Sequence, residues 1–229
     1  AFAAEGHVDS LMLLPLAGVM WAMAAGRWRL AGVLLGTAIA AKLIAAVLLP
    51  WFALRRPKAA AIALLVAATT YLPYLGAGRG LAESLVRFSS GPTFMSLAHS
   101  LIDLPVDDRV LRVAAVALLA AVCVVLAIRR RDPIEYAVGA TGAMLMLMPV
   151  VHAWYLTWIV LWMPISLRAR WLAAAGAMVV YYEAAYAQAF TGEWALPAWA
   201  PWVVWGVFGV TWAIEIAVRR RRSVDAASS

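Results

Sequence analysis

Cysteine and charged residues are scarce in this sequence, and each scarcity excludes a class of protein. The 229 residues include one cysteine, Cys123, so an internal disulfide bond and a cysteine-built metal site are both excluded. Only 14% of the residues are charged and 66% are hydrophobic, whereas an ordinary soluble domain is about 45–50% apolar. The mean hydropathy of +0.86 agrees. The composition therefore predicts an all-α, polytopic transmembrane helical bundle.

The first residues of the sequence do not lead us to expect a signal peptide. The chain begins with alanine, and neither a basic n-region nor a cleavage motif precedes the first apolar run. We therefore expect a fragment that lacks the N-terminal part of a longer membrane protein. An internal repeat and a low-complexity linker are absent as well.

Long apolar runs recur over the whole length, and runs of about 18 residues or more are typical of membrane helices. A β-barrel would instead need short segments of alternating hydrophobicity. We expect about eight or nine membrane helices or half-helices, at residues 8–25, 29–42, 44–54, 59–77, 110–128, 134–151, 153–167, 171–190 and 201–218.

The run RLAGVLLGTAIAAKLIAAVLLPWFAL is interrupted only by Lys42. Arg27 and Arg29 precede it, and three basic residues follow it at positions 55–58. A single crossing would put one basic cluster outside, which the positive-inside rule disfavours. The sequence therefore predicts a short helical hairpin that turns near Lys42, with arms of about 14 and 11 residues.

With this hairpin, the charges segregate to two faces. Fourteen of the 19 lysines and arginines fall on the face that we predict to be cytoplasmic. This clustering at membrane boundaries argues against nucleic acid as the reason for the net charge of +7. The opposite face collects the groups that can move protons or hold anions: Glu5, His7, Asp9, Glu83, His99, Asp103, Asp107, Asp108, His152 and Glu193. The chemistry is therefore expected on the non-cytoplasmic face, which also carries the long polar loop 78–109.

Two candidate site segments lie in the first part of the chain. EGHVD places Glu5, His7 and Asp9 at the start of an apolar run, where Asp9 could instead cap a helix. Lys42 lies between two apolar arms and could contact a phosphate at the outer mouth of the bundle, or snorkel to the interface. Arg79 and Arg87 in the loop could hold phosphate, with solvated loop charge as the alternative.

A third candidate segment is MPVVHAWYLTWIVLWMP. An interfacial aromatic belt accounts for Trp154 and Tyr155. For His152, the two interpretations, an interfacial residue and a site residue, have equal weight. Glu183 and Glu215 are expected to be buried acids with structural roles, either neutral and hydrogen-bonded or paired with an arginine.

Five segments follow one another along the chain: an acidic GHVD segment, a GRWR turn, an LAGVLLGTAIAAKL arm, an LLPWFALRRP return arm and VHAWYLTWIVLWMP. This ordered set resembles GT-C membrane glycosyltransferases. The similarity is closest to glycosyltransferase family 87, the polyprenyl-phosphate-mannose-dependent mannosyltransferases, over about residues 3–170. The resemblance implies that a polyprenyl-phosphate sugar donates its sugar to a hydroxyl of a lipid or glycan acceptor on the outer face. A lipid-linked donor needs no nucleotide-binding fold, and no cofactor is implied; metal dependence stays open.

The resemblance also suggests roles for the candidate residues. It implies that cations bind the donor phosphate, for which the candidates are Lys42, His152, Arg79 and Arg87. A carboxylate takes the hydroxyl proton, with Asp9 and Glu5 as candidates, and the candidates for substrate contact are His7, Trp154 and Tyr155. In GT-C enzymes the principal catalytic acid usually lies in the first external loop. We expect that loop to be upstream of this chain, and the fragment is then not expected to be active alone.

The expected organisation is a membrane-embedded glycosyltransferase domain at residues 1–222, with the external loop 78–109, and a disordered cytoplasmic tail at residues 223–229. The expected location is a bacterial cytoplasmic membrane, with the active site facing outward. Two alternatives were weighed. A transporter or flippase for a lipid-linked or small anionic substrate predicts polar residues through the bilayer midplane and often a repeat, and the sequence has neither. A non-catalytic scaffold has no need of Lys42 and EGHVD beside apolar segments.

Overall fold

The computed structural model describes residues 9–78, 80, 83, 93–101, 107–193 and 195–228. Within these ranges all regular secondary structure is helical, and the single extended pairing is an isolated parallel bridge between Phe94 and Val150. The predicted all-α fold class is therefore confirmed. The chain divides into two compact units, unit 1 with residues 1–92 and 105–144, and unit 2 with residues 93–104 and 145–229. Each unit is described by itself.

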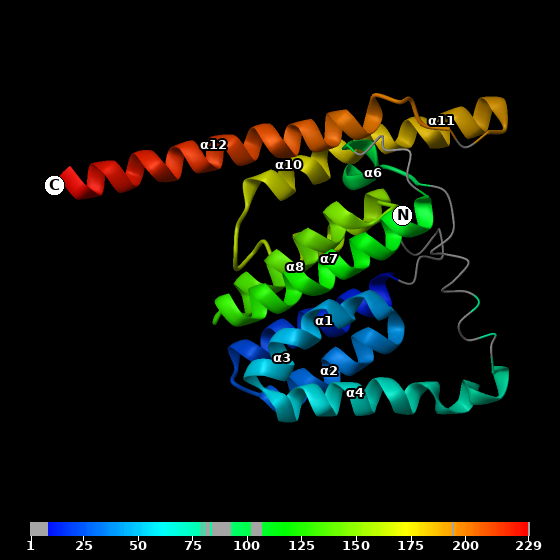
Figure 1. The fold of residues 1–229 in the computed structure, drawn as a ribbon, viewed down its shortest axis with the longest axis vertical. Coiled ribbons are helices and arrows are strands. Elements are labelled where there is room, and N and C mark those ends of the chain that lie inside the picture. The colour runs from blue at the N-terminus through cyan, green and yellow to red at the C-terminus, as the bar shows by residue number, and fades with distance from the viewer. Residues whose placement is uncertain are drawn as a thin grey trace. The chain divides into compact units, whose positions relative to one another are not determined.

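Unit 1 contains the N-terminal helices and one long later helix. Its described elements are α1 (Asp9–Ala24), α2 (Trp28–Ala41), η1 (Leu43–Leu48), α3 (Leu49–Arg55), α4 (Pro57–Tyr71), η2 (Leu72–Ala77) and α7 (Asp108–Arg129). The helix α8 (Pro133–Leu147) begins in unit 1 and ends in unit 2. Within unit 1, α2 packs against both α1 and α4, and the three helices lie side by side (Figure 1).

Small residues allow α2 and α4 to approach closely. A Cβ atom added to Gly36 would lie 2.5 Å from the backbone oxygen of Ala63, and one added to Gly32 would overlap the backbone oxygen of Ala59. The pattern GVLLG on α2 thus faces alanines four residues apart on α4. Such small-residue contacts bring backbones together in membrane helices, where apolar burial gives little preference for helix over lipid.

The helical hairpin predicted from the basic residues is present. Lys42 has an extended backbone (φ −154°, ψ 115°) that separates α2 from η1. The ends of the two arms meet again, because the Trp28 ring lies 5.9 Å from the Trp51 ring and the Arg56 guanidinium lies 4.2 Å from the Trp28 ring. The chain therefore runs out along α2, turns at Lys42 and returns along η1 and α3.

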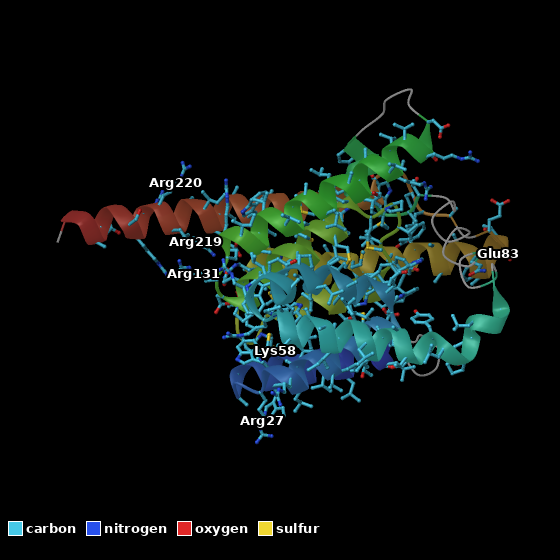
Figure 2. All side chains as sticks on the ribbon, turned by 60° about the horizontal axis from the view of Figure 1, so that its bottom comes forward. Arg27, Lys58, Glu83, Arg131, Arg219 and Arg220 are labelled. Carbon is cyan, nitrogen blue, oxygen red and sulfur yellow. The ribbon has the colours of Figure 1, made fainter. Side chains whose placement is uncertain are left out.

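The charges of unit 1 segregate as this hairpin requires. Figure 2 shows Arg27, Lys58 and Arg131 toward one end of unit 1 and Glu83 toward the other. The end of α3 is tied to the end of α7 on the basic side, since Arg55 donates a hydrogen bond to the carbonyl of Ile128 (2.9 Å). One end of unit 1 is thus basic, as positive-inside sorting predicts for a cytoplasmic end.

Three helical segments of the described chain are long and apolar enough to cross a membrane: Pro57–Ala77, Asp108–Arg129 and Ala200–Ser223. Each exposes large aliphatic side chains, among them Leu64, Leu65, Val113, Val116, Val210 and Ile214. Apolar surface of this extent around long helices suits contact with lipid tails. The chain is therefore an integral membrane protein.

Unit 2 contains shorter helices and one very long one. Its described elements are α6 (Leu97–Leu101), η3 (Ala153–Tyr155), α9 (Leu156–Val160), α10 (Ala169–Ala177), η4 (Met178–Tyr181), α11 (Tyr182–Thr191) and α12 (Ala200–Ser228). The expected span 171–190 is divided into α10, η4 and α11, and the expected span 153–167 is helical only to residue 160. The helix α12 continues past the arginine run to Ser228, where we expected a disordered tail.

Candidate functional site

An ion pair joins two of the residues singled out in the sequence. The Nζ of Lys42 donates a hydrogen bond of 2.7 Å to the Oδ1 of Asp9. Asp9 is the first residue of α1, where the positive end of the helix dipole favours a carboxylate. Lys42 occupies the break between α2 and η1, so the packing of α1 against α2 brings the two residues together.

Burial explains why these two charges need each other. The side chain of Asp9 is 2% exposed and that of Lys42 is 23% exposed. An isolated carboxylate or ammonium in such surroundings carries a large desolvation cost, which a direct charge-assisted hydrogen bond offsets. Lys42 therefore reaches a carboxylate inside the bundle, and snorkelling to the interface is not needed to account for it.

A second group of polar and aromatic side chains surrounds His152 in unit 2. The Nδ1 of His152 and the hydroxyl of Tyr181 are 2.9 Å apart and form a hydrogen bond. The tautomer of the histidine decides which of the two groups donates it. The imidazole stacks on Trp154, with 4.5 Å between ring centroids and 8° between planes, and it meets Tyr155 edge-on at 5.2 Å. We call Phe94, His152, Trp154, Tyr155 and Tyr181 the aromatic cluster.

Phe94 reaches this cluster from a short extended segment, residues 93–96, which we call the strap. Three hydrogen bonds tie the strap to the break after α8: Phe94 N–H to the Pro149 carbonyl (2.9 Å), Val151 N–H to the Phe94 carbonyl (2.8 Å) and the Ser96 hydroxyl to the Met148 carbonyl (2.7 Å). These bonds satisfy several backbone groups of the two irregular segments, as burial away from water requires.

A side chain from α12 completes the anchoring of the strap. The indole N–H of Trp205 donates to the carbonyl of Met95 (2.9 Å), and Met95 is 3% exposed. Met95 has φ +54°, in the left-handed region that non-glycine residues rarely adopt. Such a conformation persists only where surrounding contacts hold it, and those contacts also fix Phe94 beside His152.

The predicted site residues thus fall into two groups. Asp9 and Lys42 come together in unit 1, and His152, Trp154 and Tyr155 come together in unit 2. Glu5, His7, Arg79 and Arg87 lie outside the described residues, as does the side chain of His99.

The two acids expected to be buried differ. Glu215 lies beside α10 and forms an ion pair with Arg170, which was one of the two alternatives considered for it. Glu183 is exposed on α11, so the expectation of a buried acid is wrong there. Tyr181 and Ala184 occupy the buried face, and Glu183, two residues after Tyr181, lies on the other side of the helix.

Sequence reasoning did not assign Tyr181 and Phe94 to the site. Tyr181 is the last residue of η4, and its burial continues the helical spacing of Trp171, Ala174 and Met178. Phe94 belongs to the strap, whose extended backbone has no helical period. The one available signal was the YYE triplet beside Glu183. Within the residues described, no group of three or more His, Cys, Asp or Glu side chains could hold a metal ion.

A helical membrane protein with a buried ion pair and an irregular, aromatic-rich segment between its helices fits the class of polytopic membrane enzymes. The family model of glycosyltransferase family 87 matches residues 3–151, which is more than half of the chain, so the chain belongs to glycosyltransferase family 87 and is a glycosyltransferase. No curated protein and no solved structure matches it. The family match includes Asp9 and Lys42 and ends at Val151, immediately before His152.

Proposed function

We propose that the chain transfers a sugar, mannose in the first instance, from a polyprenyl-phosphate donor to an acceptor hydroxyl on the non-cytoplasmic face of a bacterial cytoplasmic membrane. Membership of glycosyltransferase family 87 supports sugar transfer. The observation that carries the choice of donor is the Asp9–Lys42 pair, which holds a cation among apolar helices, where a lipid-linked phosphate could reach it.

The chemistry explains why a cation is needed. The acceptor oxygen attacks the anomeric carbon, the bond from that carbon to the phosphate oxygen breaks, and polyprenyl phosphate leaves. The phosphodiester donor has one negative charge, and the departing monoester gains a second. An ammonium beside the phosphate therefore binds the transition state more strongly than the donor, which raises the rate of transfer. We assign this role to Lys42 of unit 1. For unit 2, considered by itself, we propose His152 as a residue that contacts the donor phosphate.

Asp9 has two roles to be separated. It could accept the proton of the acceptor hydroxyl, as Glu5 could, or it could hold Lys42 in place for the phosphate. In the first case Asp9→Asn lowers kcat and leaves donor binding unchanged. In the second case Asp9→Asn mainly raises the KM for the donor, because the ammonium is no longer fixed.

The test measures transfer of radiolabelled mannose from polyprenyl-phosphate mannose to endogenous acceptors, in membranes that contain the full-length protein. Lys42→Ala is expected to lower transfer at least a hundredfold, equivalent to about 2.7 kcal/mol, which is at the low end of losses for a group that stabilises developing negative charge. Lys42→Arg is expected to retain part of the activity. The matched control is Lys58→Ala, because Lys58 is exposed at the start of α4.

Two outcomes would contradict the proposal. Unchanged transfer in both Lys42→Ala and His152→Ala would remove the phosphate site from these residues. Transfer from a nucleotide sugar and none from the polyprenyl-phosphate sugar would overturn the donor class while leaving the family intact.

The orientation can be tested separately by labelling single cysteines from outside. In a Cys123→Ala background, an impermeant maleimide is expected to label cysteines placed at positions 7 and 99. It should not label cysteines placed at positions 56 and 130, which lie at the basic end of unit 1. The reverse pattern would place the site on the cytoplasmic face.

A further inference from the structure

We propose that Tyr181 is a positioning residue: its hydroxyl fixes the ring of His152 so that the other ring nitrogen, Nε2, donates a hydrogen bond to the donor phosphate. This inference rests on the proposed function, because it specifies how His152 would contact the phosphate. Tyr181 lies beyond the part of the chain that the family model matches.

Three neighbours restrict the His152 ring in three different ways. The stack on Trp154 fixes the plane of the imidazole, with 8° between the two rings. Tyr155 meets the ring edge-on at 86° and limits its sliding across Trp154. The hydroxyl of Tyr181, 2.9 Å from Nδ1, fixes the rotation of the ring within its plane. A flipped imidazole would lose this last contact.

The hydrogen bond also selects the tautomer. When the hydroxyl of Tyr181 donates to Nδ1, the neutral imidazole carries its proton on Nε2, which can then donate to a phosphate oxygen. The other tautomer would present a lone pair to that anion. A neutral hydroxyl partner adds no negative charge near the phosphate, whereas a carboxylate at the same place would repel it.

The ring of Tyr181 is itself packed among aromatic neighbours. It is 2% exposed, and Phe94 and Trp154 meet it edge-on at 5.5 Å and 5.7 Å between centroids. Replacement by phenylalanine keeps these contacts and removes the oxygen alone. Tyr181→Phe therefore separates the positioning role from packing.

The first experiment compares Tyr181→Phe with Tyr186→Phe in the full-length enzyme, with polyprenyl-phosphate mannose as the donor. Tyr186 is a matched control because it is a tyrosine on the following helix α11 and is 63% exposed. Tyr181→Phe is expected to lower kcat/KM for the donor about tenfold, the effect of losing one oriented hydrogen bond. Tyr186→Phe should leave it unchanged, and an equal kcat/KM in all three proteins would overturn the proposal.

A double-mutant cycle shows whether Tyr181 acts through His152. In a His152→Ala background, Tyr181→Phe is expected to cause no further loss of kcat/KM, because the ring that it positions is gone. A second tenfold loss in that background would mean that Tyr181 acts independently, and the proposal would be wrong.

A spectroscopic measurement makes the test independent of the donor. The chain has three histidines, so the ¹⁵N signals of His152 can be assigned by their loss in His152→Ala. The wild-type signals should show the tautomer protonated at Nε2, and Tyr181→Phe should shift them toward a mixture of tautomers. An Nδ1-protonated ring in the wild type would refute the inference. If the expected signals are present but no sugar is transferred from the lipid donor, the proposed function fails while the positioning of His152 stands.

Discussion

The two candidate regions hold polar groups among apolar side chains by different means. In unit 1, regular helices bring together opposite charges, Asp9 and Lys42. In unit 2, irregular backbone brings together neutral groups, with His152 bonded to a tyrosine hydroxyl and stacked on the ring of Trp154. A charged pair suits the binding of an anion that gains charge during the reaction, whereas a neutral cluster suits orientation of a ring with a chosen tautomer.

This difference has an energetic consequence. A buried ion pair is close to balanced while both partners remain, and it becomes costly when one is removed and the other stays charged. A neutral hydrogen bond contributes only about 0.5–1.5 kcal/mol. The Asp9–Lys42 pair should therefore be far more sensitive to the loss of one polar side chain than the aromatic cluster. The predictions below test that contrast.

The largest effect is expected for Lys42→Met. The substitution preserves most of the side-chain volume but removes the ammonium that pairs with Asp9, whose side chain is 2% exposed. The free energy of unfolding should fall by about 3–5 kcal/mol. It can be measured by tryptophan fluorescence during denaturation of the purified protein in detergent.

Two further variants check the cause of this loss. Lys58→Met, at an exposed position, should change the free energy of unfolding little. The double variant Asp9→Leu with Lys42→Met should be more stable than Lys42→Met alone, because no uncompensated charge remains. A double variant as unstable as the single one would show that packing around Lys42, and not charge, is decisive.

A medium effect is expected where α2 touches α4. In Gly36→Ala the new methyl group would lie 2.5 Å from the Ala63 carbonyl oxygen and 2.7 Å from the Cβ of Val66, so the two helices must separate. Overpacking of this kind lowers the free energy of unfolding by about 1–3 kcal/mol, and a backbone neighbour puts the value toward the upper end.

The control for this substitution lies in unit 2. Gly209 on α12 has open space where a Cβ atom would lie, since a Cβ there would meet nothing within 4 Å. Gly209→Ala should keep or slightly raise the melting temperature, because alanine favours the helix over glycine. Equal melting temperatures for Gly36→Ala and the wild type would contradict the close approach of α2 and α4.

A smaller effect is expected for the hydrogen bond that holds the strap. Trp205→Phe removes the donor to the Met95 carbonyl. It should lower the free energy of unfolding by about 1 kcal/mol more than the same substitution at a matched tryptophan. The match is Trp162, which is 1% exposed and whose indole N–H has no hydrogen-bond partner within the described part of the chain. Trp162→Phe therefore loses similar ring volume without a bond, and thermal denaturation of both variants gives the difference. Equal losses would mean that the strap bond contributes nothing.

The sequence predicts unit 1 better than unit 2, and the reason is physical. The hairpin at Lys42 follows from where the basic residues lie, because the cost of moving charge across a membrane acts on the whole chain. The partner of Lys42 did not follow, since the distance between Asp9 and Lys42 depends on how α1 packs against α2.

The aromatic cluster was predicted only in part. His152, Trp154 and Tyr155 are neighbours in the chain, so one segment identifies them. Tyr181 continues the buried face of α10, but its place beside His152 depends on how η4 packs. Phe94 arrives through an extended strap that has no helical period. Irregular backbone is held by particular hydrogen bonds, and these depend on tertiary neighbours that composition and spacing do not specify.

The smallest effect is expected for an exposed ion pair in unit 1. Asp108 and Arg112 are one helical turn apart on α7, with 3.9 Å between Oδ2 and a guanidinium nitrogen, and the Asp108 side chain is 68% exposed. Water screens such a pair, so Asp108→Asn should lower the free energy of unfolding by less than about 0.5 kcal/mol. Added salt should abolish even that difference, while the loss in Lys42→Met should persist because the Asp9 carboxylate, which loses the ammonium of Lys42, is shielded from the solvent. If Asp108→Asn proved as destabilising as Lys42→Met, burial would not be what distinguishes the Asp9–Lys42 pair, and the argument for a charged site held inside unit 1 would lose its physical basis.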